Sequence, residues 1–207
     1  MKNNARKKII VALIVILALL ALLSALTILL DKLANAPKKE SGETTAPPPI
    51  EFSKEYITDR KTFESDLKYM GYDRMIYYYD PQTGVSEGLL EDQYKTYGKE
   101  VMFLCSFIES IIAGDAERYN AMFSDAYYLE HDPRESFSMQ KLYDIRIAPY
   151  TKSEGMEESA LIYMLDYKIR RNNGSFRSDI DSDGSRTQYI YIREYNGEYR
   201  IDRIVSP

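Results

Sequence analysis

The sequence predicts an α+β protein, in which an N-terminal transmembrane helix precedes one domain of helices packed on a curved antiparallel sheet. Three observations lead to this prediction. Residues 9–30 form an uninterrupted apolar run, and apolar residues within 91–113 recur at the spacing of a helix. After residue 136 the apolar period changes to two, which is typical of strands. Helices followed by a run of strands indicate the α+β class.

The apolar run is long enough to cross a bilayer once. Its 22 residues are all Ile, Val, Ala, Leu, Ser or Thr, and as a helix they span about 33 Å, compared with about 30 Å for a hydrocarbon core. Cationic side chains at positions 2, 6, 7 and 8 mark residues 1–8 as a cytoplasmic tip. We therefore expect a single-pass protein of the cell membrane whose C-terminal domain is extracytoplasmic.

A cleaved signal peptide is the alternative interpretation of this run. Ala34-Asn35-Ala36 has the small-x-small form of a cleavage site. However, the run exceeds the roughly 7–15 residues of a signal-peptide core, and Pro37 directly follows the site. These two features favour an uncleaved anchor.

Residues 31–50 are predicted to be a flexible linker, and residues 51–207 one domain. The linker ends in three consecutive prolines and has few apolar side chains. After residue 50 there remain 20 Lys and Arg against 29 Asp and Glu, a formal charge of −9, which argues against a nucleic-acid partner. The chain has one cysteine, Cys105, and one histidine, His131. Disulfides within the chain and sites that need two histidines are therefore excluded, and we predict no cofactor.

Helical patterns fill most of the first half of the domain. Thr58-Asp59 can cap a short helix that presents Phe63, Leu67 and Met70 on one side and ends at Gly71. Residues 72–90 suggest an extended piece and a loop. A long helix is then predicted over 91–113, followed by a shorter helix that begins after Asp115.

Strand patterns follow. Apolar residues alternate over 139–147 and again over 161–169. Asn196-Gly197 lies between two alternating runs, which is the strongest short-range signal for a hairpin. This turn predicts that Ile192 lies opposite Ile201 and that Arg193 lies opposite Arg200.

Two motifs in this region resemble the NTF2-like superfamily. They are Ile-Ile-Ala-Gly-Asp-Ala-Glu-Arg-Tyr at 111–119 and Tyr-Asn-Gly-Glu-Tyr-Arg-Ile-Asp at 195–202, with Tyr199 where that family usually has Trp. The likeness covers about residues 91–205 and is greatest to extracytoplasmic, membrane-tethered members from Gram-positive bacteria. The resemblance implies a cone-shaped fold, in which a bent sheet wraps the long helix and leaves a pocket. It implies no single activity.

Two sets of residues are candidates for chemistry. Tyr97, Tyr163 and Tyr167 are predicted to point into the cone, but no base accompanies them on the same face, so we expect core tyrosines rather than an active site. The second set begins like a calcium loop, with a glycine at the sixth position but Ile190 where a bidentate Glu is needed, so a surface turn is favoured. Its carboxylates are Asp179, Asp181 and Asp183.

The best candidate for a binding surface is the face of the predicted hairpin that points away from the helices. It would carry tyrosine and arginine, which are enriched at protein interfaces, at Tyr189, Tyr191, Arg193, Tyr195 and Arg200. We therefore expect a noncatalytic module that binds a protein partner or a second copy of itself. The alternative is a receptor that holds a small apolar ligand in the cone.

Overall fold

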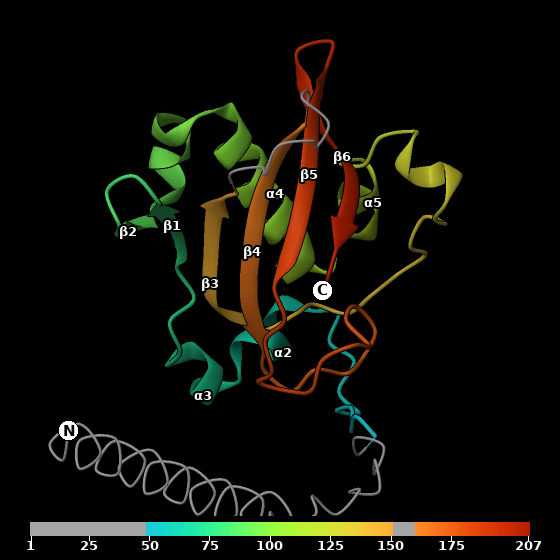
Figure 1. Cartoon of the computed structure of the whole chain (residues 1–207). Helices are drawn as coiled ribbons and strands as arrows, with labels where there is room; N and C mark the ends of the chain where they lie inside the picture. The colour runs from blue at the N-terminus through green and yellow to red at the C-terminus, as the bar shows by residue number, and fades with distance from the viewer. Residues whose placement is uncertain (1–48, 151–159) are drawn as a thin grey trace, which may run out of the picture. The chain divides into compact units, whose positions relative to one another are not determined.

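The domain is built on one mixed sheet. The computed structural model describes residues 49–150 and 160–207. The strands are β1 (Ile76–Asp80), β2 (Val85–Leu89), β3 (Leu142–Pro149), β4 (Leu161–Ile169), β5 (Gln188–Tyr195) and β6 (Glu198–Val205). Within the described residues they form a six-stranded sheet in the order β2-β1-β3-β4-β5-β6 (Figure 1).

Short helices precede and follow one long helix. They are α2 (Arg60–Glu64), α3 (Leu67–Met70), the 3-10 helix η1 (Glu91–Tyr97), α4 (Lys99–Ala113), α5 (Ala116–Asn120) and the 3-10 helix η2 (Tyr127–Leu129). Helices and strands thus occupy largely separate parts of the chain, which confirms the predicted α+β class.

The prediction of a purely antiparallel sheet is wrong at one pair of strands. β1 runs parallel to β3, with Ile76 opposite Ile145, while the other neighbouring strands are antiparallel. β2 folds back on β1 as a hairpin, and the chain then passes through η1, α4 and α5 before it enters β3. A crossover that contains helices is the kind of connection that parallel pairing requires.

The core lies between α4 and one face of the sheet. In Figure 1, α4 lies behind strands β3 to β5. Its stripe of apolar residues is buried, as predicted, and packs in one cluster with the inward side chains of the strands. The cluster includes Val101, Leu104, Cys105, Phe107, Ile108, Ile111, Ile145, Ile147, Leu165, Ile190, Ile192 and Ile201.

The single helix predicted over 91–113 is wrong in its first part. Residues 91–97 form the 3-10 helix η1, and the α-helix begins only after Gly98. Gly98 has φ 106° and ψ 159°, a conformation that interrupts any helix and that glycine adopts most readily.

The predicted capped helix near residue 60 is divided in two. Asp59 caps α2 as expected, but the Asp66 side chain accepts a hydrogen bond from the Tyr69 backbone and caps a second helix, α3. As a result, Phe63 and Tyr69 are buried, whereas Leu67, predicted on the apolar side, is 83% exposed.

The hairpin of β5 and β6 has the predicted register. Ile192 lies opposite Ile201 and Arg193 opposite Arg200, and both turn residues have positive φ. The register shifts by one residue between Tyr191 and Ile192, which marks a β-bulge in this pair of strands.

The predicted anchor lies outside the described residues, as do residues 1–8 and most of the predicted linker. Within 49–150 and 160–207, no helix has the length and apolar character needed to cross a bilayer.

Candidate interaction surface

The outer face of the sheet is the face that points away from α4. Strand pairing places two rows of side chains across it. One row consists of Ala148, Met164, Tyr189 and Val205, and the next consists of Ile162, Tyr191 and Arg203. The Tyr150 ring also meets the Tyr189 ring edge-on, with centroids 5.0 Å apart. This part of the outer face is therefore mainly aromatic and aliphatic.

Two ion pairs lie near the tip of the hairpin. Arg193 Nε lies 3.1 Å from Asp202 Oδ2, and Arg200 Nη2 lies 2.7 Å from Glu198 Oε2. The Tyr195 hydroxyl donates to Asp202 Oδ1 at 2.8 Å, and this hydrogen bond raises the pKa of Tyr195. The predicted residues share one face, but acidic neighbours balance the two predicted arginines.

Arg203 is a member of the outer face that the sequence reasoning missed. Its guanidinium lies over the Tyr191 ring, 4.1 Å from the centroid. Among the described residues, no carboxylate is within ion-pair distance of Arg203. Strict alternation from the turn would put Arg203 opposite Ile190 on the core side, and the bulge moves it to the outer face. The sequence did contain a signal for the bulge, because strict alternation would point the Arg203 side chain into an apolar core.

The three predicted pocket tyrosines do not share one site. Tyr163 and Tyr167 are buried in the core cluster. The Tyr167 hydroxyl donates to Gln188 Oε1 at 3.0 Å and accepts from Arg177 Nη1 at 3.1 Å, and burial raises its pKa. The Tyr97 hydroxyl instead donates to Glu87 Oε2 on β2 at 2.7 Å. The first two tyrosines thus fill the interior, and the third bridges η1 to the edge of the sheet.

Two of the three carboxylates of the possible calcium loop bind other groups of the protein. Asp179 accepts from Nε and Nη2 of Arg177 at 2.6 and 2.7 Å. Asp183 accepts from the Tyr143 hydroxyl at 2.8 Å, and the backbone of Asp181 accepts from the Gly184 N–H in a turn. In the described part of the chain, no three His, Cys, Asp or Glu side chains are arranged to hold a metal ion.

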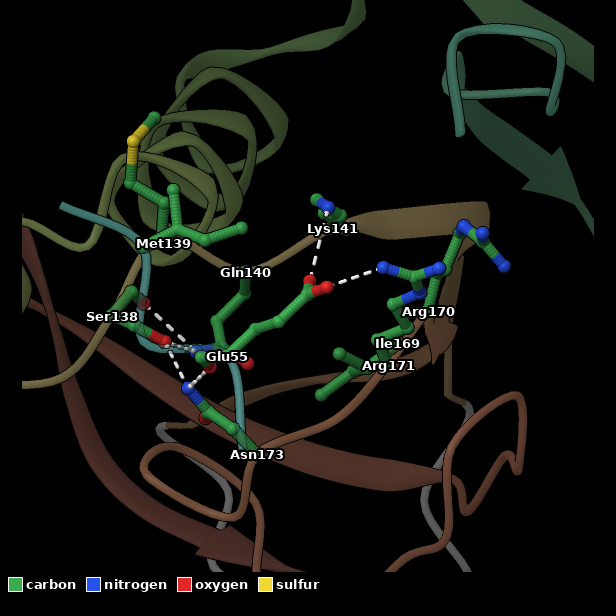
Figure 2. Close-up of a pocket in the computed structure, with 10 residues that line it drawn as sticks. Glu55, Ser138, Met139, Gln140, Lys141, Ile169, Arg170, Arg171 and Asn173 are labelled. Carbon is green, nitrogen blue, oxygen red and sulfur yellow. Dashed lines mark hydrogen bonds and ion pairs between the residues drawn. The ribbon is translucent and has the colours of Figure 1, made fainter. Parts of the chain in front are cut away.

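A second polar site lies where the chain enters the domain, and we call it the linker-end ion cluster. Lys141, only 4% exposed, places Nζ 2.9 Å from Asp66 Oδ2. Arg170 Nε lies 3.0 Å from the same oxygen. Glu55 reaches Lys141 at 3.7 Å and pairs with Arg171 (Figure 2). These five residues come from distant parts of the chain and form no motif, so the sequence alone did not reveal them.

The pairing of Asp66 with Arg170 favours the charged form of both side chains. Burial alone would raise the pKa of Asp66, but hydrogen bonds from Lys141 and Arg170 outweigh it and hold that pKa well below its usual range. For Arg170, burial would lower the pKa, and the hydrogen bond to Asp66 outweighs burial and raises it. The cluster therefore acts as a fixed ionic link between α3, the start of β3 and the end of β4.

Backbone hydrogen bonds hold the same entry segment to the domain. The Ser53 N–H donates to the Asn172 carbonyl at 2.7 Å, and the Met139 N–H donates to the Ile57 carbonyl at 2.8 Å. The segment around Glu55 is therefore attached to the domain on both sides of that residue.

Comparisons with protein-family models, with curated proteins and with solved structures gave no match to this chain.

Proposed function

We propose that this chain is a noncatalytic interaction module of NTF2-like fold, held at the cell membrane by residues 9–30 with its domain outside the cell. The module binds a protein partner, or a second copy of itself, through the outer face. The observation that carries this proposal is the contrast between the two faces of the sheet, because the inner face is filled and the outer face presents Tyr189, Tyr191 and Arg203.

The filled interior supports a binding module over a receptor for a small apolar ligand. Tyr163, Leu165, Tyr167 and Ile190 are all buried against the helix side of the sheet. A ligand pocket inside the cone would need this space. The Tyr167 hydroxyl is also occupied by Gln188 and Arg177, which leaves it no role as an acid or a donor to a substrate.

The outer face has the composition of a protein interface. Tyr189 and Tyr191 are half-buried and so offer rigid aromatic area at small entropic cost, while Arg203 is exposed above Tyr191. A planar guanidinium held over a ring can donate hydrogen bonds to a partner without first leaving an ion pair. Tyr191 and Arg203 are therefore the expected centre of the interface.

The arrangement of the long helix supports the NTF2-like part of the proposal. α4 packs on one face of the sheet, as the resemblance implies. Register shifts in the β3–β4 and β5–β6 pairs mark bulges, and bulges bend a sheet.

Photocrosslinking in the native host tests the proposed interface. A photoreactive phenylalanine analogue replaces Tyr191 in the full chain, and a matched chain carries it at the exposed Glu117 on α5. We expect an adduct from position 191 that disappears in the Arg203→Glu variant, and no adduct from position 117. An adduct of twice the mass of the chain would indicate self-association. An adduct of any other mass would indicate a different protein as the partner. Equal labelling at both positions, or an adduct that survives Arg203→Glu, would contradict the proposal.

A further inference from the structure

Several large apolar side chains are exposed on residues 52–70. Phe52 and Tyr56 lie on the entry segment and are 40% and 54% exposed. Leu67 and Met70, on α3, are 83% and 37% exposed. Isolated apolar residues on a surface need no explanation, but a group of them marks a contact with something less polar than water.

Two of these side chains belong to one groove. Tyr56 and Leu67 line it together. Two basic and two acidic residues of the linker-end ion cluster also line it, namely Lys141, Arg171, Glu55 and Asp66. The groove thus has apolar side chains beside charged groups. The arrangement resembles the boundary between the acyl chains and the headgroups of a bilayer.

Three exposed lysines belong to the same stretch of the chain, residues 52–70. Lys54, Lys61 and Lys68 are exposed, and among the described residues no carboxylate lies within 4 Å of their ammonium groups. Three of the nearby acids are engaged, since Asp66 lies in the ion cluster, Glu64 pairs with Arg60 and Glu55 pairs with Arg171, whereas Glu51 is exposed. These three ammonium groups are therefore available to an anionic ligand, in a domain whose formal charge is −9.

The entry segment is also where the predicted linker joins the domain. Figure 1 places the start of the described chain and α3 toward one end of the domain, and the tip of the β5–β6 hairpin toward the other. Residues 31–50, fully extended, span at most about 70 Å, and a folded-back linker spans less. The exposed group is therefore within reach of any bilayer that residues 9–30 cross.

From these observations we propose that residues 52–70 form a docking patch for the surface of an anionic phospholipid bilayer. Leu67, Tyr56, Phe52 and Met70 enter the interface between headgroups and acyl chains, and the three lysines contact lipid phosphates. The inference rests on the proposed membrane anchor and adds an orientation to it. With this end on the lipid, the hairpin tip points away from the membrane and the outer face stands open to a partner.

Each side chain of the patch would contribute only a small binding free energy, and the contributions of the apolar and cationic side chains add. Apolar side chains gain by leaving water, and each cation near an anionic surface adds electrostatic attraction. The patch is presented rigidly, because Phe63 and Tyr69 from the same stretch are buried and Asp66 is held by two cations. No folding on the membrane is needed, so little binding energy is lost to ordering.

The chain contains no tryptophan, which makes a single introduced indole a clean probe. Leu67→Trp is made in the full chain, and Leu129→Trp, at an 85% exposed position on η2, is the matched control. Both are reconstituted in vesicles of phosphatidylglycerol and phosphatidylcholine with brominated acyl chains. We expect blue-shifted emission and strong quenching at position 67, and emission typical of water at position 129. Replacing Lys54, Lys61 and Lys68 with Glu should remove most of the quenching at position 67.

Flotation of the same vesicles separates the two proposals. If the chain floats with the vesicles but position 67 is as exposed to water as position 129, the docking patch is overturned and the anchor stands. If position 67 is shielded from water yet not quenched by bromine, the patch contacts protein instead, which also overturns docking. If the chain does not float with the vesicles, the anchor and the docking patch are both overturned.

Discussion

Replacing Asp66 by Asn should lower the free energy of unfolding more than any other single substitution of a partly exposed residue at the entry to the domain. Asp66 accepts hydrogen bonds from Lys141 and Arg170, and both of those cations are almost fully buried. Asn retains an oxygen that can accept from the Tyr69 N–H, so the cap of α3 is preserved. The substitution therefore removes the charge and little else.

The magnitude follows from the two cations that would be left without their carboxylate. Removing one partner of a buried ion pair costs about 3–5 kcal/mol, because the remaining charge is neither solvated nor paired. Glu55 still reaches Lys141 at 3.7 Å and is itself partly exposed, so it compensates in part. We therefore expect a loss of about 3 kcal/mol. Changing Lys141 to Met in addition should recover part of this loss, since it removes one of the two unpaired charges.

Urea unfolding of the full chain, followed by near-UV circular dichroism of its tyrosines, measures this loss. The control is Glu64→Gln, which breaks an exposed pair with Arg60 and should cost less than about 1 kcal/mol. In the wild type, the contribution of Asp66 is present above the pKa of an unfolded Asp, about 3.9, because its pKa in the folded state is lower. It is lost as the pH falls from there through the folded pKa. A loss in Asp66→Asn no greater than in the control would refute the reasoning.

Three further predictions concern a tight turn, a buried hydrogen bond and the buried thiol. In urea unfolding, Gly114→Ala should cost about 2–4 kcal/mol of stability, because φ is +66° and the new Cβ would lie 2.7 Å from the Met139 nitrogen. The control Gly197→Ala, which has positive φ but open space around its Cβ, should cost about 1 kcal/mol. Tyr167→Phe should cost about 1–3 kcal/mol of stability, because the buried Arg177 guanidinium and the Gln188 amide each lose a hydrogen-bond partner. Equal free energies of unfolding for the wild type and this variant would contradict the prediction. Burial raises the pKa of Cys105 to about 12, so iodoacetamide at pH 8 should add mass to the chain only after urea unfolds it, and labelling of the folded chain would show that the thiol is accessible.

Local patterns predicted much of the fold. The Asn196-Gly197 turn determined the register of the hairpin, because positive φ at both residues leaves one way to pair the flanking strands. The apolar stripe on α4 was also readable, since a helix buried on one side must repeat at three and four residues. These features depend on neighbours in the sequence.

What the sequence did not reveal depends on caps and contacts that the periodicity of a single segment does not show. Leu67 has the right spacing for a buried face, yet Asp66 starts a new helix and turns that side chain to solvent. The bulge that brings Arg203 beside Tyr191 arises because the alternative would bury a guanidinium among isoleucines. The residues of β1 do not indicate its parallel pairing, because the same alternation of side chains is compatible with a parallel or an antiparallel neighbour.

The parallel pair has a consequence for biosynthesis. The partner of β1 is β3, which follows roughly 70 residues later in the chain. One edge of the β1–β2 hairpin therefore stays unpaired until α4, α5 and β3 have left the ribosome. That edge carries the consecutive tyrosines at 77–79, a segment rich in strand-forming side chains. A chain that stalls before residue 142 would therefore expose a template for another copy, and slow synthesis should lead to aggregation that begins at this hairpin.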